Sequence, residues 1–276
     1  MRRGLKKQII EVVAVLTSLV IFGIPFYYIF INSVKTRSEA AILNLKPPSK
    51  FNLIENYGEV LKTRDGIVIR AFFNSTVITV ASIIVLVLVC AMAGFVLQRR
   101  ISKVSKFFNA VFLTGLMLPP FVITTIWVLQ RIGLFKTLIG LVLVEVSLQI
   151  PFTLVLYKNF MATIPKEIDE SAFLDGCSSI RMFFQIHLPL LKPVTSTAIV
   201  LSAVTIFNDF TNPLYFLPGA KNATVQLTLY NFMSQFVTSW NLLFADVVLI
   251  SIPPLVLFIF FNKKIIAGMT DGAIKG

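Results

Sequence analysis

Residues Phe72–Leu97 read FFNSTVITVASIIVLVLVCAMAGFVL and contain no charged side chain. A helix needs roughly 20 mainly apolar residues to cross the hydrocarbon core of a bilayer, and this stretch exceeds that length. The small polar residues and the glycine within it are tolerated in membrane helices. The stretch therefore predicts a membrane-spanning helix, and the rest of the chain can be interpreted from it.

The composition of the whole chain agrees with a membrane protein. Of 276 residues, 56% are hydrophobic and only 14% are charged, and the mean hydropathy is +0.84. An average soluble domain is about 25% charged, so a typical cytosolic enzyme is excluded. The net charge of +12 would suggest nucleic acid for a soluble protein. Here the basic residues lie beside apolar runs, where they report membrane orientation, and no nucleic acid partner is expected.

The same length criterion predicts six spans, and hence an all-α integral membrane fold with a single transmembrane domain over residues 1–276. The expected spans are about 9–31, 72–97, 107–130, 138–161, 194–217 and 242–262. A loop at 162–193 and a basic tail at 263–276 are the segments outside the spans that carry the most information.

Lysine and arginine predict the orientation of these spans. If the N-terminus is cytoplasmic, the inner segments and span ends carry 15 of the 25 basic residues. Seven of the remaining ten lie in the long loop at 32–71, where four acids dilute them. Short loops are the informative ones under the positive-inside rule. We therefore expect both termini, and the loop at 162–193, on the cytoplasmic side.

Local rules predict two short helices in the loop at 162–193. Pro165 suits a first helical turn, and the helix dipole favours the three carboxylates that follow, Glu167, Asp169 and Glu170. Gly176 suits the left-handed residue that closes a helix. Ser178 or Ser179 can cap a second helix, which is expected to end before Pro189.

The two predicted helices are rich in apolar side chains, more than a free loop should expose. These residues are Ile168, Phe173, Leu174, Met182, Phe183, Phe184 and Ile186. Helices of about ten residues are marginal in water by themselves, so something must cover this surface. On the pattern alone, the cover is either the protein's own helix ends and the lipid interface, or a separate cytoplasmic protein.

The loop resembles the EAA loop of permease subunits in binding-protein-dependent ABC importers. The residues that fit this pattern at fixed spacing are Glu170, Ala172, Asp175, Gly176, Phe183, Ile186, Leu188, Pro189 and Pro193. Ser171 and Cys177 stand where the family usually has alanine, and both are small. The resemblance implies that the loop docks on an ATPase subunit through the coupling residues Glu167, Glu170, Ala172, Asp175, Gly176 and Phe183.

Motifs elsewhere are similar to the carbohydrate-uptake branch of this family. They include Met117-Leu118-Pro119, Asn208-Asp209-Phe210 and the ending from Gly268 to Gly276. That ending resembles the smaller six-span permease of maltose-type importers, which implies tail contacts with the ATPases through Thr270, Gly272 and Lys275. Phe207 replaces a usual tryptophan, and the end of the second span, Val96 to Arg99, departs from the usual small-aromatic-small-Arg pattern.

The resemblance implies a type I ABC importer permease in the plasma membrane of a prokaryote. Its partners would be a second homologous permease, two ATPase subunits that bind ATP-Mg, an extracytoplasmic sugar-binding protein and membrane lipid. The substrate would be a di- or oligosaccharide. The chain has no Gly-x-x-x-x-Gly-Lys-Ser/Thr phosphate loop, so we expect a non-catalytic subunit without a cofactor of its own.

Polar residues inside the predicted spans are candidates for the solute path. Glu145 and Gln149 are four residues apart and share a helix face. A second stripe recurs at helical spacing and contains Thr205, Asn208, Asp209 and Asn212. Two such stripes would suit a wet path for a polyol. Polar residues also join membrane helices to each other, so packing remains an open alternative for these positions.

The sequence gives little support for a metal site or for another class of membrane protein. The single histidine, His187, has no second ligand at a useful spacing, so no metal site is expected, and we expect its side chain to face solvent or a partner. An importer for another solute, such as a polyamine, remains an alternative because of the acids in the spans. A self-sufficient secondary transporter would be supported by inverted repeats, and an integral-membrane enzyme would need an acid, base or metal constellation; the sequence offers neither.

Overall fold

The structure is a computed structural model that describes residues 2–100, 102–233 and 238–273, without the side chains of 2–9 and 262–273. The described residues form helices and their connections, and the only pairing of β type among them is an isolated bridge between Met233 and Thr238. The chain divides into two compact units. One contains residues 1–71 and 225–252, and the other contains 72–224 and 253–276.

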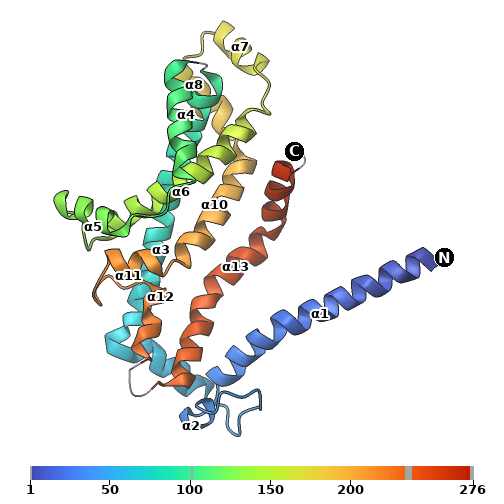
Figure 1. Ribbon diagram of the computed structural model, residues 1–276, viewed down its shortest axis with the longest axis vertical. Helices are drawn as coiled ribbons and strands as arrows, with labels where there is room; N and C mark the ends of the chain where they lie inside the picture. Colours follow the sequence, from blue (N-terminus) through green and yellow to red (C-terminus); the bar gives the residue numbers. More distant parts are fainter. Residues whose placement is uncertain (1, 101, 234–237, 274–276) are drawn as a thin grey trace. The chain divides into compact units, whose positions relative to one another are not determined.

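Four helices in the described part of the chain are long and apolar enough to cross a membrane. They are α1 (Arg2–Ser33), α3 (Leu53–Arg99), α6 (Leu138–Met161) and α13 (Trp240–Ala273), labelled in Figure 1. They include the stretches predicted at 9–31, 72–97, 138–161 and 242–262. A fifth span results only if two helical stretches that meet at a bend of 73°, Ser179–Leu190 and Lys192–Phe207, are taken as one.

The span predicted over 107–130 is interrupted in the structure. The structure has α4 (Lys103–Gly115) and α5 (Val122–Arg131), with an irregular stretch between them. The reason is Pro119-Pro120, because proline lacks the N–H that a helix interior needs and disfavours helix at the residue before it. α4 closes before the prolines: the N–H of Met117 donates to the carbonyl of Thr114 at 2.9 Å.

The span predicted over 194–217 is interrupted as well. Here α10 (Lys192–Phe207) is followed by α11 (Thr211–Phe216). Oδ1 of Asp209 accepts the backbone N–H of Thr211 at 2.8 Å and that of Asn212 at 3.3 Å. Asp side chains compete with the helix for backbone donors in this way, so Asp209 takes up two backbone donors at the start of α11.

The first unit is held together by buried amides and one buried lysine. Its smaller helices are α2 (Arg37–Ala40), α12 (Val225–Thr228) and the 3₁₀ turn η2 (Leu229–Asn231). Nζ of Lys35 donates to the carbonyl and the Oδ1 of Asn44, at 2.8 and 3.0 Å. Asn56 donates to the carbonyls of Ser33 and Lys35, both at 2.8 Å, and accepts from Asn241 at 2.8 Å. The connection from α1 to α3 therefore has a defined shape.

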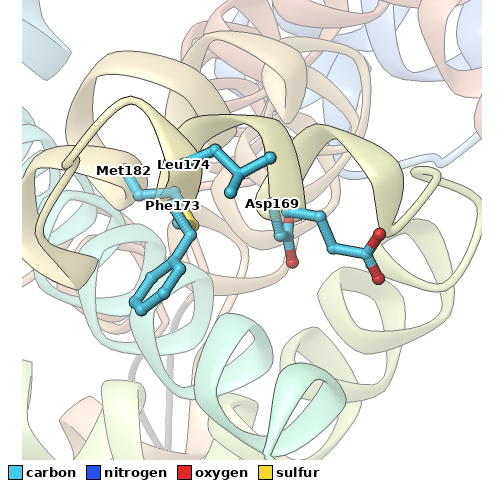
Figure 2. Close-up of a pocket in the computed structure, with 5 residues that line it drawn as sticks. Asp169, Phe173, Leu174 and Met182 are labelled. Atoms are coloured by element: carbon cyan, nitrogen blue, oxygen red, sulfur yellow. The ribbon is translucent and has the colours of Figure 1, made fainter.

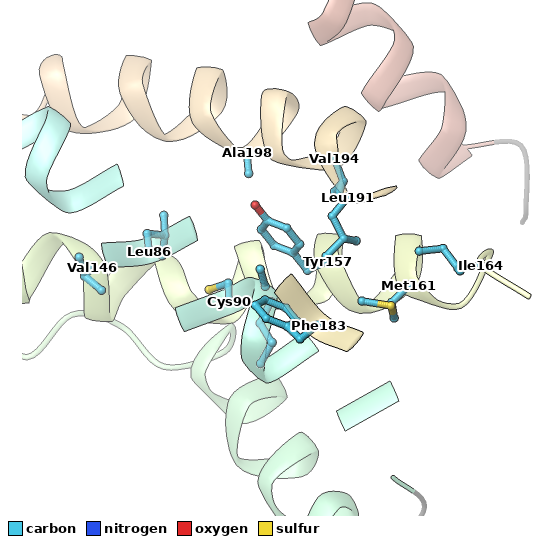
Figure 3. Close-up of a cluster of buried hydrophobic side chains, with 12 residues drawn as sticks. Leu86, Cys90, Val146, Tyr157, Met161, Ile164, Phe183, Leu191, Val194 and Ala198 are labelled. Carbon is cyan, nitrogen blue, oxygen red and sulfur yellow. The ribbon is translucent and has the colours of Figure 1, made fainter. Parts of the chain in front are cut away.

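The core of the second unit joins the later part of α3, α6 and α10 to the loop at 162–193 (Figure 3). Its buried residues are Leu86, Cys90, Ala91, Val146, Leu154, Tyr157, Met161, Ile164, Phe183, Leu191, Val194 and Ala198. Tyr157 is fully buried, and its Oη donates to Oγ1 of Thr195 at 2.9 Å. A Cβ on Gly94 would lie 3.0 Å from that of Tyr157, so the glycine permits close approach of α3 and α6. The loop is thus anchored in a packed core.

Candidate functional site

The loop at 162–193 begins with α7 (Glu167–Leu174), the first of the two helices predicted there. Three carboxylates lie in its first turn, where they face the positive end of the helix dipole. Ser171 Oγ donates to the carbonyl of Glu167 at 2.7 Å. An eight-residue helix is marginal by itself, so its end and its packing determine whether it persists.

The end of α7 is a Schellman motif centred on Gly176, as the sequence predicts. Gly176 has φ +73°, and its N–H donates to the carbonyl of Phe173 at 3.0 Å. The N–H of Cys177 donates to the carbonyl of Ala172 at 2.9 Å. These are the two bonds that define the motif. Asp175 is the exposed C-cap residue of the helix, so it shapes this turn.

The second limb of the loop runs further than predicted. α8 (Ser179–Met182) is capped by Ser178, whose Oγ accepts the N–H of Arg181. A π-helical turn, η1 (Phe183–His187), and α9 (Leu188–Leu190) follow. The second helix is predicted to end before Pro189. α8 and η1 do end before it, at Met182 and His187, but α9 begins directly at Leu188, whose N–H donates to the carbonyl of Phe183. Pro189 lies in the first turn of α9, where a missing N–H needs no partner.

One side of the loop is buried against the second unit. Phe183 is part of the core, and its ring lies 5.6 Å from that of Phe95 in α3. Ala172 and Met182 are also buried. Two of the predicted coupling residues, Ala172 and Phe183, therefore face the protein's own interior.

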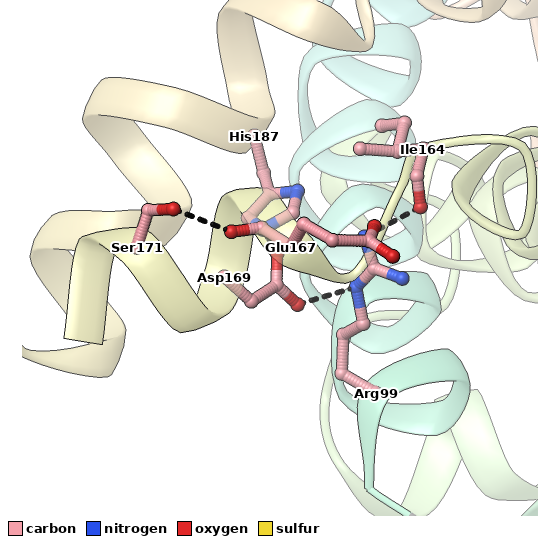
Figure 4. Close-up of polar contacts among 6 residues, drawn as sticks. All are labelled: Arg99, Ile164, Glu167, Asp169, Ser171 and His187. Atoms are coloured by element: carbon pink, nitrogen blue, oxygen red, sulfur yellow. Dashed lines mark hydrogen bonds and ion pairs between the residues drawn. The ribbon is translucent and has the colours of Figure 1, made fainter. Parts of the chain in front are cut away.

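A polar cluster ties α7 to the end of α3 (Figure 4). Nε of Arg99 lies 2.7 Å from Oδ2 of Asp169, and Nε2 of His187 lies 2.8 Å from Oδ1 of the same carboxylate. Nη2 of Arg99 also donates to the carbonyl of Ile164 at 3.0 Å. The three side chains are 10%, 20% and 0% exposed for Arg99, Asp169 and His187. We call these three residues the 99–169–187 cluster.

The position of His187 corrects the expectation that it faces solvent or a partner. Its ring is fully buried and lies 4.7 Å from the ring of Phe95. Burial lowers the pKa of His187, and the nearby Asp169 carboxylate only partly opposes this effect.

The other side of the loop is exposed and combines a carboxylate with large apolar side chains. Glu170 is exposed, and Phe173, Leu174 and Ile180 are 75%, 86% and 74% exposed. We call these four residues the 170–180 face. Beside it lies an open hollow lined by Asp169, Glu170, Phe173, Leu174 and Met182, shown in Figure 2. Glu167 is also exposed, at the start of α7. Such a face on an otherwise anchored loop is typical of a protein contact.

A second group of predicted residues meets where α10 breaks. Glu145 of α6 is buried, and its Oε1 accepts from Nδ2 of Asn212 at 3.2 Å. Asp209, whose side chain accepts the first N–H groups of α11, is half-buried, and its carboxyl group lies within interaction range of the Glu145 carboxyl group. The structure thus brings together three polar residues that the sequence placed on two separate stripes.

The remaining candidates for the solute path lie around this group. Gln149 is half-buried in α6, and Thr205 and Asn208 are exposed. The hydroxyl group of Thr205 donates to the carbonyl of Leu201 at 2.9 Å, which satisfies it within its own helix.

The residues predicted to make tail contacts lie near the C-terminus. Thr270 and Gly272 fall within α13, and Lys275 lies outside the described residues. Over the same described part of the chain, no group of three or more His, Cys, Asp and Glu side chains is placed to hold a metal ion.

Sequence reasoning missed the 99–169–187 cluster. Asp169 stood out only as a first-turn carboxylate and Arg99 only as the basic end of a span. A single sequence gives no sign that two residues 70 positions apart, such as Arg99 and Asp169, form a pair. The isolated histidine in an apolar stretch was the one available hint.

Comparison with known proteins places the chain among transport components. Residues 90–271 match the model of the family described as binding-protein-dependent transport system inner membrane component. The chain is 32% identical to the probable starch degradation products transport system permease protein AmyC of Thermoanaerobacterium thermosulfurigenes, over 91% of both chains. It is 30% identical to the melibiose/raffinose/stachyose import permease protein MelC of Bacillus subtilis, over 99% of this chain and 100% of that one.

A solved structure supports the fold. The chain resembles one in the crystal structure of a bacterial ABC transporter involved in the import of the acidic polysaccharide alginate. The TM-score is 0.80, with 17% sequence identity over 94% of this chain and 95% of that one. At this identity the likeness concerns the fold alone, and it agrees with the permease fold expected from the sequence.

Proposed function

Because the chain belongs to the family of inner membrane components of binding-protein-dependent transport systems, we propose that it is the permease subunit of an ATP-driven importer of di- or oligosaccharides. With a second, homologous permease it would enclose the solute path. An extracytoplasmic binding protein would deliver the sugar, and two ATPase subunits would supply the energy by binding and hydrolysing ATP-Mg.

The observation that carries this proposal is the 170–180 face. Its exposed carboxylate and three large apolar side chains lie on a loop whose opposite side is buried in the core of the second unit. An ATPase subunit with an apolar groove and a basic residue opposite Glu170 is the partner that fits this chemistry. The distribution of lysine and arginine favours a cytoplasmic position for this loop and for both termini.

The sugar substrate is supported by two relatives that match almost the full chain. They are permeases for starch degradation products and for melibiose, raffinose and stachyose. The group formed by Glu145, Asp209 and Asn212 offers carboxylate and amide oxygens and an amide N–H. Such groups bind the hydroxyls of a polyol, so this group is our candidate for sugar contact in this subunit.

Reconstitution of the complete transporter in proteoliposomes tests the proposal. We expect sugar uptake that requires the binding protein, the second permease, the ATPase subunits and ATP. Glu170→Lys should abolish co-purification of the ATPase and ATP-dependent uptake, because it reverses the charge at the centre of the 170–180 face. Glu59→Lys, which reverses an exposed carboxylate of α3 in the other unit, is the matched control and should retain the ATPase.

Two outcomes would contradict the proposal. Solute transport by this chain without any ATPase would instead support a self-sufficient transporter. Unweakened retention of the ATPase by Glu170→Lys would remove the 170–180 face as the docking surface.

A second candidate substrate is a cationic solute such as a polyamine. The carboxyl groups of Glu145 and Asp209 lie together in the spans, and anionic groups favour a cation. Competition for uptake separates the two: unlabelled oligosaccharides should displace the labelled solute of a sugar importer, whereas only polyamines should displace that of a polyamine importer.

A further inference from the structure

We propose that the 99–169–187 cluster is a mechanical link that makes α7 and the end of α3 move as one body. This inference rests on the proposed function, in which α7 receives the movement of an ATPase subunit. Arg99, Asp169 and His187 are thus positioning residues for transport, although none of them belongs to the 170–180 face.

The geometry joins three separate segments through one carboxylate. Asp169 lies in α7, Arg99 is the last residue of α3, and His187 ends the π-helical turn η1. Each carboxylate oxygen has its own partner, at 2.7 Å for Arg99 and 2.8 Å for His187. Both distances are in the range of close contacts between a carboxylate and a charged or polar nitrogen. Two short contacts from one carboxylate therefore hold α7 close to the end of α3 and to η1 at the same time.

Burial makes this link hard to replace. With His187 fully buried and Arg99 only 10% exposed, water has little access to the partners of Asp169. Loss of the carboxylate would leave a nearly buried guanidinium group without its counter-charge, which is far more unfavourable than loss of an exposed pair. The second bond of Arg99, to the carbonyl of Ile164 at 3.0 Å, extends the link to the start of the loop.

The other contacts of α7 cannot supply the same rigidity. Ile168 packs against the core cluster and Ala172 is buried beneath the helix. Apolar contacts are non-directional, so they would allow a short helix to rotate or slide while it stays covered. Among the described contacts of α7 outside its own loop limb, the Asp169–Arg99 pair joins opposite charges at 2.7 Å. A pull on the 170–180 face is therefore transmitted to α3 through this pair.

The experiment uses the complete transporter and measures sugar imported per ATP hydrolysed. Asp169→Asn keeps the shape of the side chain, but an amide cannot accept from both Arg99 and His187. We expect the ATPase to remain bound and to hydrolyse ATP within about twofold of the wild-type rate. The sugar imported per ATP should fall by about tenfold or more. Asp169→Glu, which restores the charge, should recover part of this ratio.

Arg181→Gln is the matched control. Arg181 lies in the same loop, but its bond to Gln185 at 2.8 Å is exposed, and exposed polar pairs contribute little. Its ratio of sugar to ATP should stay within about twofold of wild type. This control separates loss of the buried link from loss of any loop arginine.

An unchanged ratio in Asp169→Asn would overturn the inference, provided that the wild-type complex imports sugar. Should Asp169→Asn not assemble, Arg99→Gln takes its place because it also breaks the Arg99–Asp169 pair, and an unchanged ratio in that variant would overturn the inference equally. A wild-type complex that shows no ATP-dependent import would instead contradict the proposed function. The two failures are therefore distinguishable.

Discussion

Gly176 offers a direct test of whether the shape of α7 matters for transport. Its φ of +73° lies in the left-handed region, and an added Cβ would meet nothing within 4 Å. Gly176→Ala therefore introduces backbone strain without a steric clash. The left-handed conformation costs about 1–2 kcal/mol for a residue with a Cβ, and Asn tolerates it better than Ala.

This penalty is large for so short a helix. The two bonds of the Schellman motif, at 3.0 and 2.9 Å, close the carbonyl end of α7, and about 1–2 kcal/mol corresponds to a 5- to 30-fold change in an equilibrium constant. We expect Gly176→Ala to lower the population of the closed turn by that factor. The side chains of Phe173 and Leu174, which precede the turn, would then lose their fixed position on the 170–180 face.

Gly133 provides the matched control for this prediction. It has φ +71°, has nothing within 4 Å of an added Cβ, and follows the end of α5, outside the loop at 162–193. Gly133→Ala and Gly176→Ala should lower the thermal stability of the purified protein by similar amounts. Only Gly176→Ala should reduce ATPase retention and ATP-dependent uptake, and Gly176→Asn should be less affected. Equal loss of uptake in both alanine variants, or no loss in Gly176→Ala, would refute this reasoning.

Three further substitutions test side-chain contacts that each lie within one of the two units. Tyr157→Phe should lower the stability of the protein in detergent by about 1 kcal/mol, because it removes the bond to Thr195; thermal unfolding measures this. Lys35→Met should leave buried acceptors unsatisfied, at a cost of about 1–3 kcal/mol, and make residues 36–52 more susceptible to limited proteolysis. Asn212→Ala should raise the KM for sugar uptake, since it removes the amide partner of Glu145, whereas unchanged kinetics would reduce this pair to helix packing.

The loop at 162–193 shows which features a sequence can predict. The left-handed turn at Gly176 and the cap at Ser178 follow from residues next to them in the chain, so local rules were sufficient for both. The end of the second limb was missed because it depends on tertiary packing. Phe183 is buried in the core and begins the π-helical turn, after which α9 continues the limb through Pro189.

The spans show the same division between local and tertiary causes. Long apolar runs identified α1, α3, α6 and α13, since length and composition are sufficient for a continuous membrane helix. A hydropathy profile does not detect the breaks at Pro119-Pro120 and at Asp209, because the residues on either side of each break are apolar. The signals were present as a proline pair and as a potential capping residue, but Asp209 was interpreted only as a path residue.

The break at 208–210 also bears on where a solute passes. Irregular backbone within a membrane is tolerated only where it is buried in protein or lines a water-filled cavity. Asp209 satisfies two of the donors that the break frees, yet Thr205 and Asn208 beside it are exposed in this chain alone. A lipid-facing position would place these polar groups in hydrocarbon. In the proposed importer the break would therefore face either the second permease or the aqueous path. Because Glu145 and Asn212 meet at the same point, we expect helix packing and solute contact to compete there.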